Sequence, residues 1–208
     1  MRICTHLRSN IPKGVPYMPA NKALIAAVSD DTKASLSSMV LEAGLTDVSV
    51  TNGKNLRDLC AEHDYDVVIS VFPFESEFGA ETAAYISKTF NVCQVIFVPS
   101  KVYDEVCAKL SGTGAVILPK SSPRELAVNS IRCAAAMKNK MDDLRSENKM
   151  LRDMVNEMKL VNRAKCVLIE YLKISEKEAH RQIQKRAMDQ RVTLTEVAAD
   201  ILKTYEYR

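Results

Sequence analysis

The six cysteines of this 208-residue chain are its first candidates for zinc ligands or catalytic nucleophiles. Zinc sites need close pairs of such ligands, and a catalytic nucleophile needs a base beside it. The cysteines show no CxxC pair and no companion histidines, and most stand in apolar runs, which is typical of reduced, buried thiols. They are Cys4, Cys60, Cys93, Cys107, Cys133 and Cys166. Nucleotide-binding loops and catalytic triads are also missing from the sequence, so we expect no metal, no cofactor and no enzymatic activity.

A second group of polar residues comes directly after predicted strands. Asp30 and Asp31 follow the first apolar run of the chain, Ser100 follows the fourth, and Lys120 follows the fifth. The carboxyl ends of parallel strands meet at one edge of a sheet, and ligands of open α/β sheets bind there. We therefore expect these side chains to lie at a common edge.

The elements that must position them are short apolar runs alternating with amphipathic segments. Strands are expected at 22–28, 47–51, 66–72, 92–98 and 115–118, with helices at 32–43, around 56–60, at 80–89 and at 103–110. Five apolar strands alternating with helices predict a five-stranded, doubly wound parallel sheet of the flavodoxin type, covered by helices on both faces.

Residues 21–133 resemble the receiver domain of two-component response regulators. In that family two acids after the first strand bind Mg²⁺, an aspartate ending the third strand accepts a phosphoryl group, and a Ser or Thr and a Lys sense it. The resemblance places Asp30 and Asp31 at the acids, Ser100 at the hydroxyl and Lys120 at the lysine.

The acceptor position of the receiver family is occupied by Val71 in this chain. Valine has no lone pair to attack phosphorus, and the missing carboxylate removes one Mg²⁺ ligand. Glu75 and Glu77 follow in the next loop, but nothing in their spacing places them at the strand tip. We predict a pseudo-receiver that forms no acyl-phosphate, in which Asp30 and Lys120 remain as a surface ion pair.

A long helix is predicted from Pro123, which suits a first helical turn, to the neighbourhood of Lys173. Its apolar seam repeats with alternating spacings of four and three, at Met137, Met141, Leu144, Asn148, Leu151, Val155, Met158 and Asn162. Leucine at d positions and a buried asparagine such as Asn148 at an a position favour a parallel two-stranded coiled coil, hence a homodimer. The alternative is that the seam packs on the receiver-like domain of the same chain.

Two capping boxes mark the starts of further helices, one at residues 175–178 (SEKE) and one at 193–196 (TLTE). The pattern predicts three helices: the end of the long helix and two more, starting near Glu176 and Leu194. Their inner faces are expected to be Ala164, Val167, Leu168, Tyr171 and Leu172, then Ala179, Ile183 and Ala187, then Leu194, Val197, Ala198, Ile201 and Leu202.

This tail closely resembles the ANTAR domain. The resemblance rests on LVNRAKCVLI at 160–169, ISEKEAH at 174–180, AM at 187–188, TEVA at 195–198 and IL at 201–202, with Cys166 where a glycine is usual. ANTAR proteins are bacterial transcription antitermination regulators. The resemblance implies binding to paired hairpins of a nascent leader RNA, which favours the antiterminator over the terminator.

The residue chemistry agrees with RNA as a partner, since cations contact phosphates while Arg, Gln and His can stack on or hydrogen-bond unpaired bases. The candidate contacts are Arg163, Lys165, His180, Arg181, Gln184, Lys185, Arg186 and Arg191. A DNA-binding response regulator is one alternative, but its helix-turn-helix often needs a glycine turn, and residues 189–192 contain none. A protein-interaction adaptor is the other.

The net charge of +3 requires any basic surface to be local, and no apolar stretch of membrane-spanning length is present. Residues 1–20 carry three prolines and lack the apolar core of a signal peptide, so we predict a flexible lead-in and a cytoplasmic protein. We divide the rest into the receiver-like domain at 21–133, the coiled coil at 134–162 and the ANTAR-like domain at 163–208, whose family profile could start near 147. A sensor or sequestering protein is a further possible partner.

Overall fold

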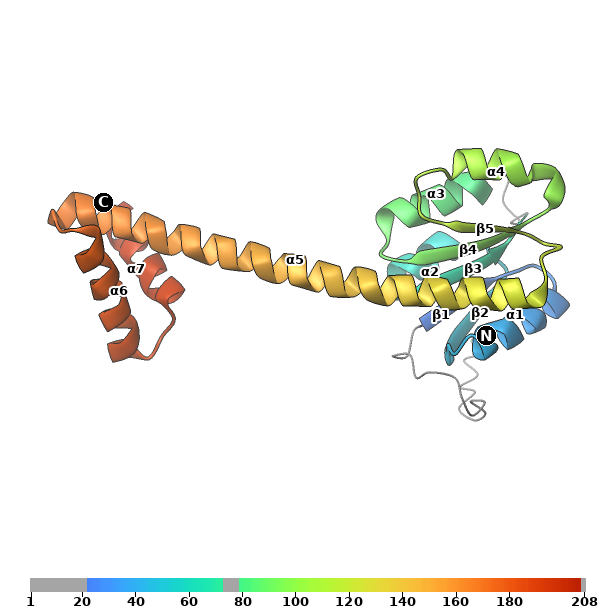
Figure 1. Ribbon diagram of the computed structural model, residues 1–208, viewed down its shortest axis with the longest axis horizontal. Helices are drawn as coiled ribbons and strands as arrows, with labels where there is room; N and C mark the ends of the chain where they lie inside the picture. Colours follow the sequence, from blue (N-terminus) through green and yellow to red (C-terminus); the bar gives the residue numbers. More distant parts are fainter. Residues whose placement is uncertain (1–21, 73–78, 207–208) are drawn as a thin grey trace. The chain divides into compact units, whose positions relative to one another are not determined.

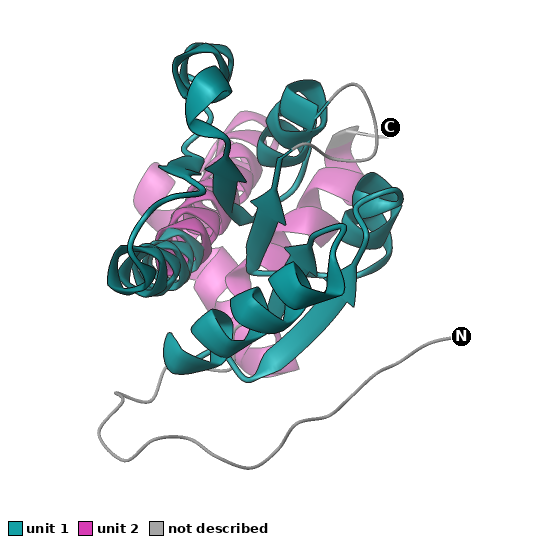
Figure 2. Cartoon of the chain, turned by 90° about the vertical axis from the view of Figure 1, so that its right-hand side faces the viewer, with its two compact units in different colours: residues 1–142 teal, residues 143–208 magenta. Residues whose placement is uncertain are grey.

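The computed structural model describes residues 22–72 and 79–206. Cys4, the predicted lead-in at 1–20 and the loop glutamates Glu75 and Glu77 lie outside the described residues. Contacts divide the chain into two compact units, residues 1–142 and 143–208 (Figure 2). Helix α5 (Arg124–Leu172) is the one element with residues in both.

The N-terminal unit contains a five-stranded sheet in which every neighbouring pair is parallel (Figure 1). The strand order is β2-β1-β3-β4-β5. The strands are β1 (Lys22–Ala26), β2 (Asp47–Thr51), β3 (Val67–Val71), β4 (Cys93–Val98) and β5 (Val116–Pro119). The chain places β2 on one side of β1 and then adds β3, β4 and β5 in turn on the other side. This reversal in the direction of strand addition confirms the predicted doubly wound sheet.

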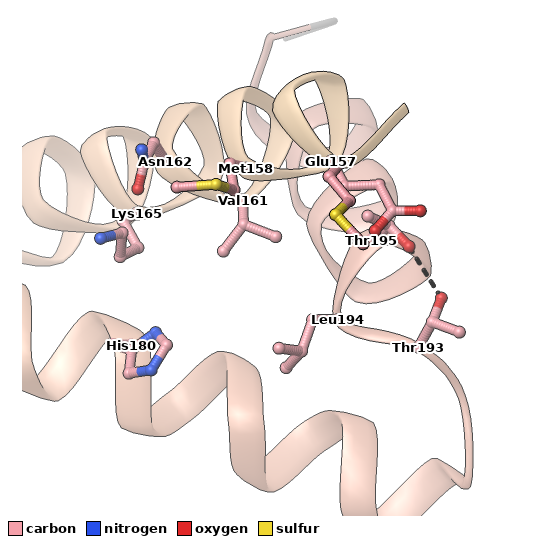
Figure 3. A pocket seen from close by; sticks show the side chains of 10 residues that line it. Glu157, Met158, Val161, Asn162, Lys165, His180, Thr193, Leu194 and Thr195 are labelled. Carbon is pink, nitrogen blue, oxygen red and sulfur yellow. Dashed lines mark hydrogen bonds between the residues drawn. The ribbon is translucent and has the colours of Figure 1, made fainter. Parts of the chain in front are cut away.

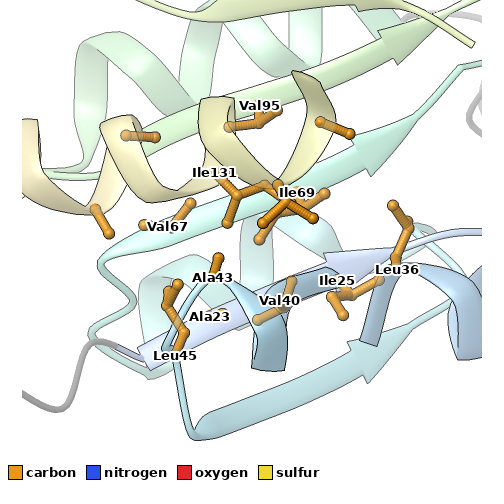
Figure 4. Packing of buried hydrophobic residues seen from close by; sticks show 14 of the residues in the cluster. Ala23, Ile25, Leu36, Val40, Ala43, Leu45, Val67, Ile69, Val95 and Ile131 are labelled. Carbon is orange, nitrogen blue, oxygen red and sulfur yellow. The ribbon is translucent and has the colours of Figure 1, made fainter. Parts of the chain in front are cut away.

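Helices cover both faces of the sheet, because the side chains of the central strands β1, β3 and β4 are almost all buried. Helices α1 (Asp30–Glu42) and α5 pack on one face, where Val40 and Ile131 meet Ile69 (Figure 4). The other face is covered by three shorter helices, whose residues Leu56, Ile86 and Val106 are buried. These are α2 (Leu56–Glu62), α3 (Gly79–Thr89) and α4 (Tyr103–Lys109).

A polar cluster forms within this unit near the amino ends of the strands. Lys138 of α5 is only 4% exposed, and its Nζ lies 3.2 Å from Oδ1 of Asp66 and also pairs with Asp142. The Asp66 carboxylate accepts a second hydrogen bond from the Lys22 backbone N–H at 2.7 Å, and Asp142 accepts one from Nδ2 of Asn91 at 2.6 Å. Burial disfavours the ammonium charge, but the hydrogen bonds to the two carboxylates outweigh it and raise the pKa of Lys138.

The C-terminal unit packs the end of α5 against α6 (Glu176–Gln190) and α7 (Leu194–Glu206). Both predicted capping boxes are present. Ser175 Oγ accepts from the Glu178 N–H at 3.3 Å while Glu178 accepts from the Ser175 N–H at 2.9 Å. The Thr193–Glu196 pair repeats this exchange at 3.2 and 2.8 Å. These reciprocal bonds satisfy N–H groups that a helix start leaves unpaired, so the helices begin where predicted.

Several predictions about burial are wrong. Tyr171, Leu172 and Leu194, predicted on inner faces, are exposed by 58%, 42% and 37%. Of the cysteines in the described residues only Cys60 and Cys93 are buried, whereas Cys133 and Cys166 are exposed. The exposure of Tyr171 and Leu172 shows that α6 and α7 do not cover the whole apolar face predicted at the end of α5. Burial raises the pKa of the Cys60 thiol to about 11.

In the part of the chain that the structure describes, no helix combines the length and apolar character needed to cross a membrane.

Candidate nucleic-acid interface

The carboxyl edge of the sheet gathers the residues predicted there. Val71 is the last residue of β3, and Asp30 and Asp31 open α1 after β1. Ser100 opens the 3-10 turn η1 (Ser100–Val102) after β4, and Lys120 follows β5, where its N–H donates to the Val98 carbonyl at 2.8 Å. Because the strands are parallel, all five positions lie at one edge. Their roles remain predictions.

The ion pair predicted between Asp30 and Lys120 does not form. Oδ1 of Asp30 lies 2.8 Å from Nζ of Lys33, one turn along α1, and Lys120 is exposed. A partner three residues away on the same helix is held close by the helix itself, whereas Lys120 would have to extend across the sheet edge. The hydrogen bond from Lys33 lowers the pKa of the Asp30 carboxyl.

A receiver-type Mg²⁺ site does not fit these residues. Asp30 is engaged with Lys33, Asp31 is exposed, and the strand tip presents the half-buried apolar side chain of Val71, which packs against the main core. Among the described residues no group of three or more His, Cys, Asp or Glu could hold a metal ion.

A different surface, on the outer side of α6, concentrates exposed cations. With 3.6 residues per turn, Arg181, Gln184 and Lys185 share the face opposite the buried Ala179 and Ile183. All three are exposed. Lys177, which was not among the predicted contacts, stands one turn before Arg181 on the same face and is also exposed. Its spacing of four from Arg181 was the signal that could have identified it. We call Lys177, Arg181, Gln184 and Lys185 the α6 outer face.

The other predicted contacts are distributed differently. Arg186 is exposed but stands on the flank of α6, and Arg191 is the left-handed C-cap of that helix, with φ 57°. Arg163 is an exposed residue of α5. The structure therefore brings only part of the predicted set onto one face.

Two of the predicted contacts, Lys165 and His180, are not exposed side chains. Nζ of Lys165 lies 2.8 Å from Oε1 of Glu176, and the lysine side chain is only 15% exposed. The hydrogen bond from Lys165 lowers the pKa of Glu176. His180 is half-buried, and its Nδ1 is buried without a hydrogen-bond partner. An i to i+11 pairing across two helices carries no local sequence signal, so the sequence could not reveal it.

The predicted heptad seam of α5 is exposed along its length. Its apolar members Met137, Met141, Leu144, Leu151, Val155 and Met158 are between 39% and 65% exposed. Within the N-terminal unit, Met137 and Met141 at the start of the seam are therefore not buried on the sheet, where the alternative to a dimer would place them. The dimer itself remains a prediction.

Residues 149–202 match the family model of the ANTAR domain. No curated protein sequence matches the chain.

Solved structures resemble the chain at low identity. The signal receiver domain of an HD domain-containing protein from Pseudomonas fluorescens Pf-5 is 15% identical, with a TM-score of 0.52 over 62% of this chain and 98% of that one. Full-length FixJ from B. japonicum is 11% identical (TM-score 0.52), and response regulator StyR is 12% identical (TM-score 0.54). Each of these two matches covers 88% of this chain and 98% of the other. At such identities the likeness concerns the fold alone.

Proposed function

We propose, from the premise that this chain joins an ANTAR domain to a receiver-like fold, that it is a transcription antitermination regulator. In this proposal it binds hairpins in a nascent leader RNA as a coiled-coil dimer and acts without catalysis. The family match over residues 149–202 is the observation that carries the proposal. The chemistry of the α6 outer face supports it independently.

The α6 outer face suits a folded RNA with unpaired loop bases. Lys177, Arg181 and Lys185 present three cations over about two turns, a spacing that can follow a phosphate backbone. The guanidinium of Arg181 and the amide of Gln184 can stack on or hydrogen-bond splayed bases. The carboxylate of the neighbouring Glu178 is engaged by Ser175 in the capping box, which limits its repulsion of phosphate.

The exposed seam of α5 supports the dimer. An apolar stripe with side chains 39% to 65% exposed is costly unless a second helix covers it. Asn148, at an a position, pairs best with its own copy across a two-fold axis. A parallel dimer carries two ANTAR units on one molecule, so binding the first hairpin raises the effective concentration at the second.

The test is RNA binding by the full-length Arg181→Glu/Lys185→Glu protein. We expect the double reversal to weaken binding to a two-hairpin leader RNA by about 100-fold or more, because two phosphate contacts become repulsive. Lys88→Glu/Lys101→Glu, an equal charge change on exposed lysines of the N-terminal unit, is the matched control and should bind like the wild type. Equal affinity for both variants would remove the α6 outer face from the site.

Duplex DNA of the same sequence, tested in the same gel shifts at moderate salt, separates the alternatives. Preference for DNA would indicate a DNA-binding regulator, and binding to neither nucleic acid would leave a protein-interaction adaptor.

The pseudo-receiver proposal has its own test. Incubation with acetyl phosphate and Mg²⁺ should leave the intact mass of the protein unchanged, because the tip of β3 offers no carboxylate. A stable phosphoprotein whose label maps to the carboxyl edge of the sheet would contradict it.

A further inference from the structure

A groove in the C-terminal unit has no role in the proposed function. It lies between α5, the first half of α6 and the start of α7, with a volume of about 570 Å³ (Figure 3). Met154, Met158 and Val161 of α5 line it together with Leu194, the first residue of α7. Figure 3 shows Val161 and Leu194 extending from opposite sides into the same space.

The apolar lining of the groove is accessible. Met158 is 65% exposed, Met154 48% and Leu194 37%, although a buried core lies next to them. Apolar side chains gathered in a concave surface favour an apolar occupant.

The charges around the groove favour a protein occupant over RNA. Lys165 is the one lysine or arginine among its described lining residues, and its ammonium is paired with Glu176. The carboxylate of Glu157 also lines the groove. A phosphodiester would therefore meet one neutralised cation and a repulsive anion, whereas the α6 outer face offers three exposed cations.

The groove is continuous with the heptad seam. Met158 is the last apolar d residue of the seam, and Asn162 and Lys165 occupy the next a and d positions. Lys165 pairs with Glu176 at the start of α6, and Asn162 lines the same groove as His180. Beyond Met158 the seam face of α5 thus forms one wall of the groove, opposite the chain's own α6, so a partner helix that follows the seam enters the groove.

We propose that the groove is a second dimer contact, occupied by α5 of a second copy of this chain where the seam ends. This inference rests on the dimer of the proposed function. The apolar part of the seam, from Met137 to Met158, spans only three heptads, so apolar contact in the groove at its end would add appreciably to the area that the dimer buries. In a two-fold assembly each copy covers the groove of the other, because an isologous contact is made twice.

Leu194 allows the groove to be tested apart from the seam, because it is not on α5. In the full-length protein, Leu194→Glu should weaken the dimer by about tenfold or more in sedimentation equilibrium, since it places a charge in an apolar contact. A glutamate in the first turn of α7 favours the helix, so unfolding should not be the cause, and circular dichroism checks this. Met188→Glu, at a residue 79% exposed on α6 and outside the groove, is the matched control and should leave the dimer unchanged.

A photo-crosslinking amino acid at position 194 provides a direct second measurement. It should link two copies of the chain, whereas the same group at position 188 should not. Leu144→Glu in the middle of the seam should abolish the dimer altogether.

The outcomes separate the two proposals. A wild-type protein that is monomeric at micromolar concentration contradicts both the dimer and the groove contact. A wild-type dimer that Leu144→Glu dissociates and Leu194→Glu does not affect overturns the groove contact alone. Loss of RNA binding by Leu194→Glu with an intact dimer would assign the groove to RNA and also overturn it.

Discussion

The N-terminal unit buries its sheet between helices on both faces, whereas the C-terminal unit packs three helices around a single apolar cluster. Four members of that cluster are alanines, at positions 164, 179, 187 and 198, which let helices approach closely but bury little area each. At the carboxyl edge of its sheet the larger unit has Asp30 paired with Lys33, while Lys120 is exposed. The smaller unit presents three exposed cations on the α6 outer face. The unit with the smaller core thus carries the candidate interface, and its stability depends more on each buried side chain.

Identical truncations in the two cores give the sharpest test of this difference. Ile183→Ala in α6 and Ile69→Ala in β3 remove the same atoms from side chains that are both 0% exposed. Each should cost about 3 kcal/mol of stability. In hydrogen exchange, Ile183→Ala should lose protection throughout α6 and α7, while Ile69→Ala should keep a protected sheet. Equal loss of protection in both variants would contradict the contrast between the two cores.

The next largest effect is expected at Lys138 in the N-terminal unit. Lys138→Met leaves Asp66 and Asp142 facing each other without their shared cation, which should cost about 2 kcal/mol after allowance for the partial exposure of both carboxylates. Urea unfolding followed by circular dichroism measures it. Lys140→Met, two residues away and exposed, is the control. If the two variants are equally stable, the cluster contributes nothing to the unit.

The capping boxes should matter at a smaller scale. Ser175→Ala and Thr193→Ala each remove the side-chain oxygen that accepts an N–H at the start of α6 or α7. Each should cost about 1 kcal/mol, read as faster hydrogen exchange in the first turns of these helices. Ser146→Ala, on an exposed position of α5, should have no such effect. Unchanged exchange in α6 and α7 would show that their packing alone defines the helix starts.

The smallest effect is expected from low pH, which should weaken the starts of the same two helices. The backbone N–H groups of Ser175 and Thr193 lower the pKa values of Glu178 and Glu196 below their usual range. A lowered folded-state pKa gives stability that is present above the unfolded value of about 4.3 and is lost as the pH falls through the folded pKa. Protection of the first turn of α6 should therefore decline below about pH 4. Glu178→Gln keeps an acceptor but cannot titrate, and should flatten this decline; an unchanged profile would exclude Glu178 as its cause.

Local signals made the fold largely predictable from the sequence. Strands such as β3 are rich in β-branched residues, and the starts of α6 and α7 follow from Ser-x-x-Glu and Thr-x-x-Glu spacing, which acts within one helical turn. The α6 outer face was predictable for the same reason, since periodicity alone groups Arg181 with Lys185. The burial of Leu194 was mispredicted, because an amphipathic pattern cannot tell how far a neighbouring helix extends.

The sequence alone shows that the third strand ends on a valine in place of a carboxylate, and it shows where the last two helices begin. Which charges pair between different elements is visible only in the folded chain. The fold brings Lys138 to Asp66 and Lys165 to Glu176. The physical reason is range: capping and periodicity act over three or four residues, whereas ion pairs and burial depend on elements that folding brings together from distant parts of the chain.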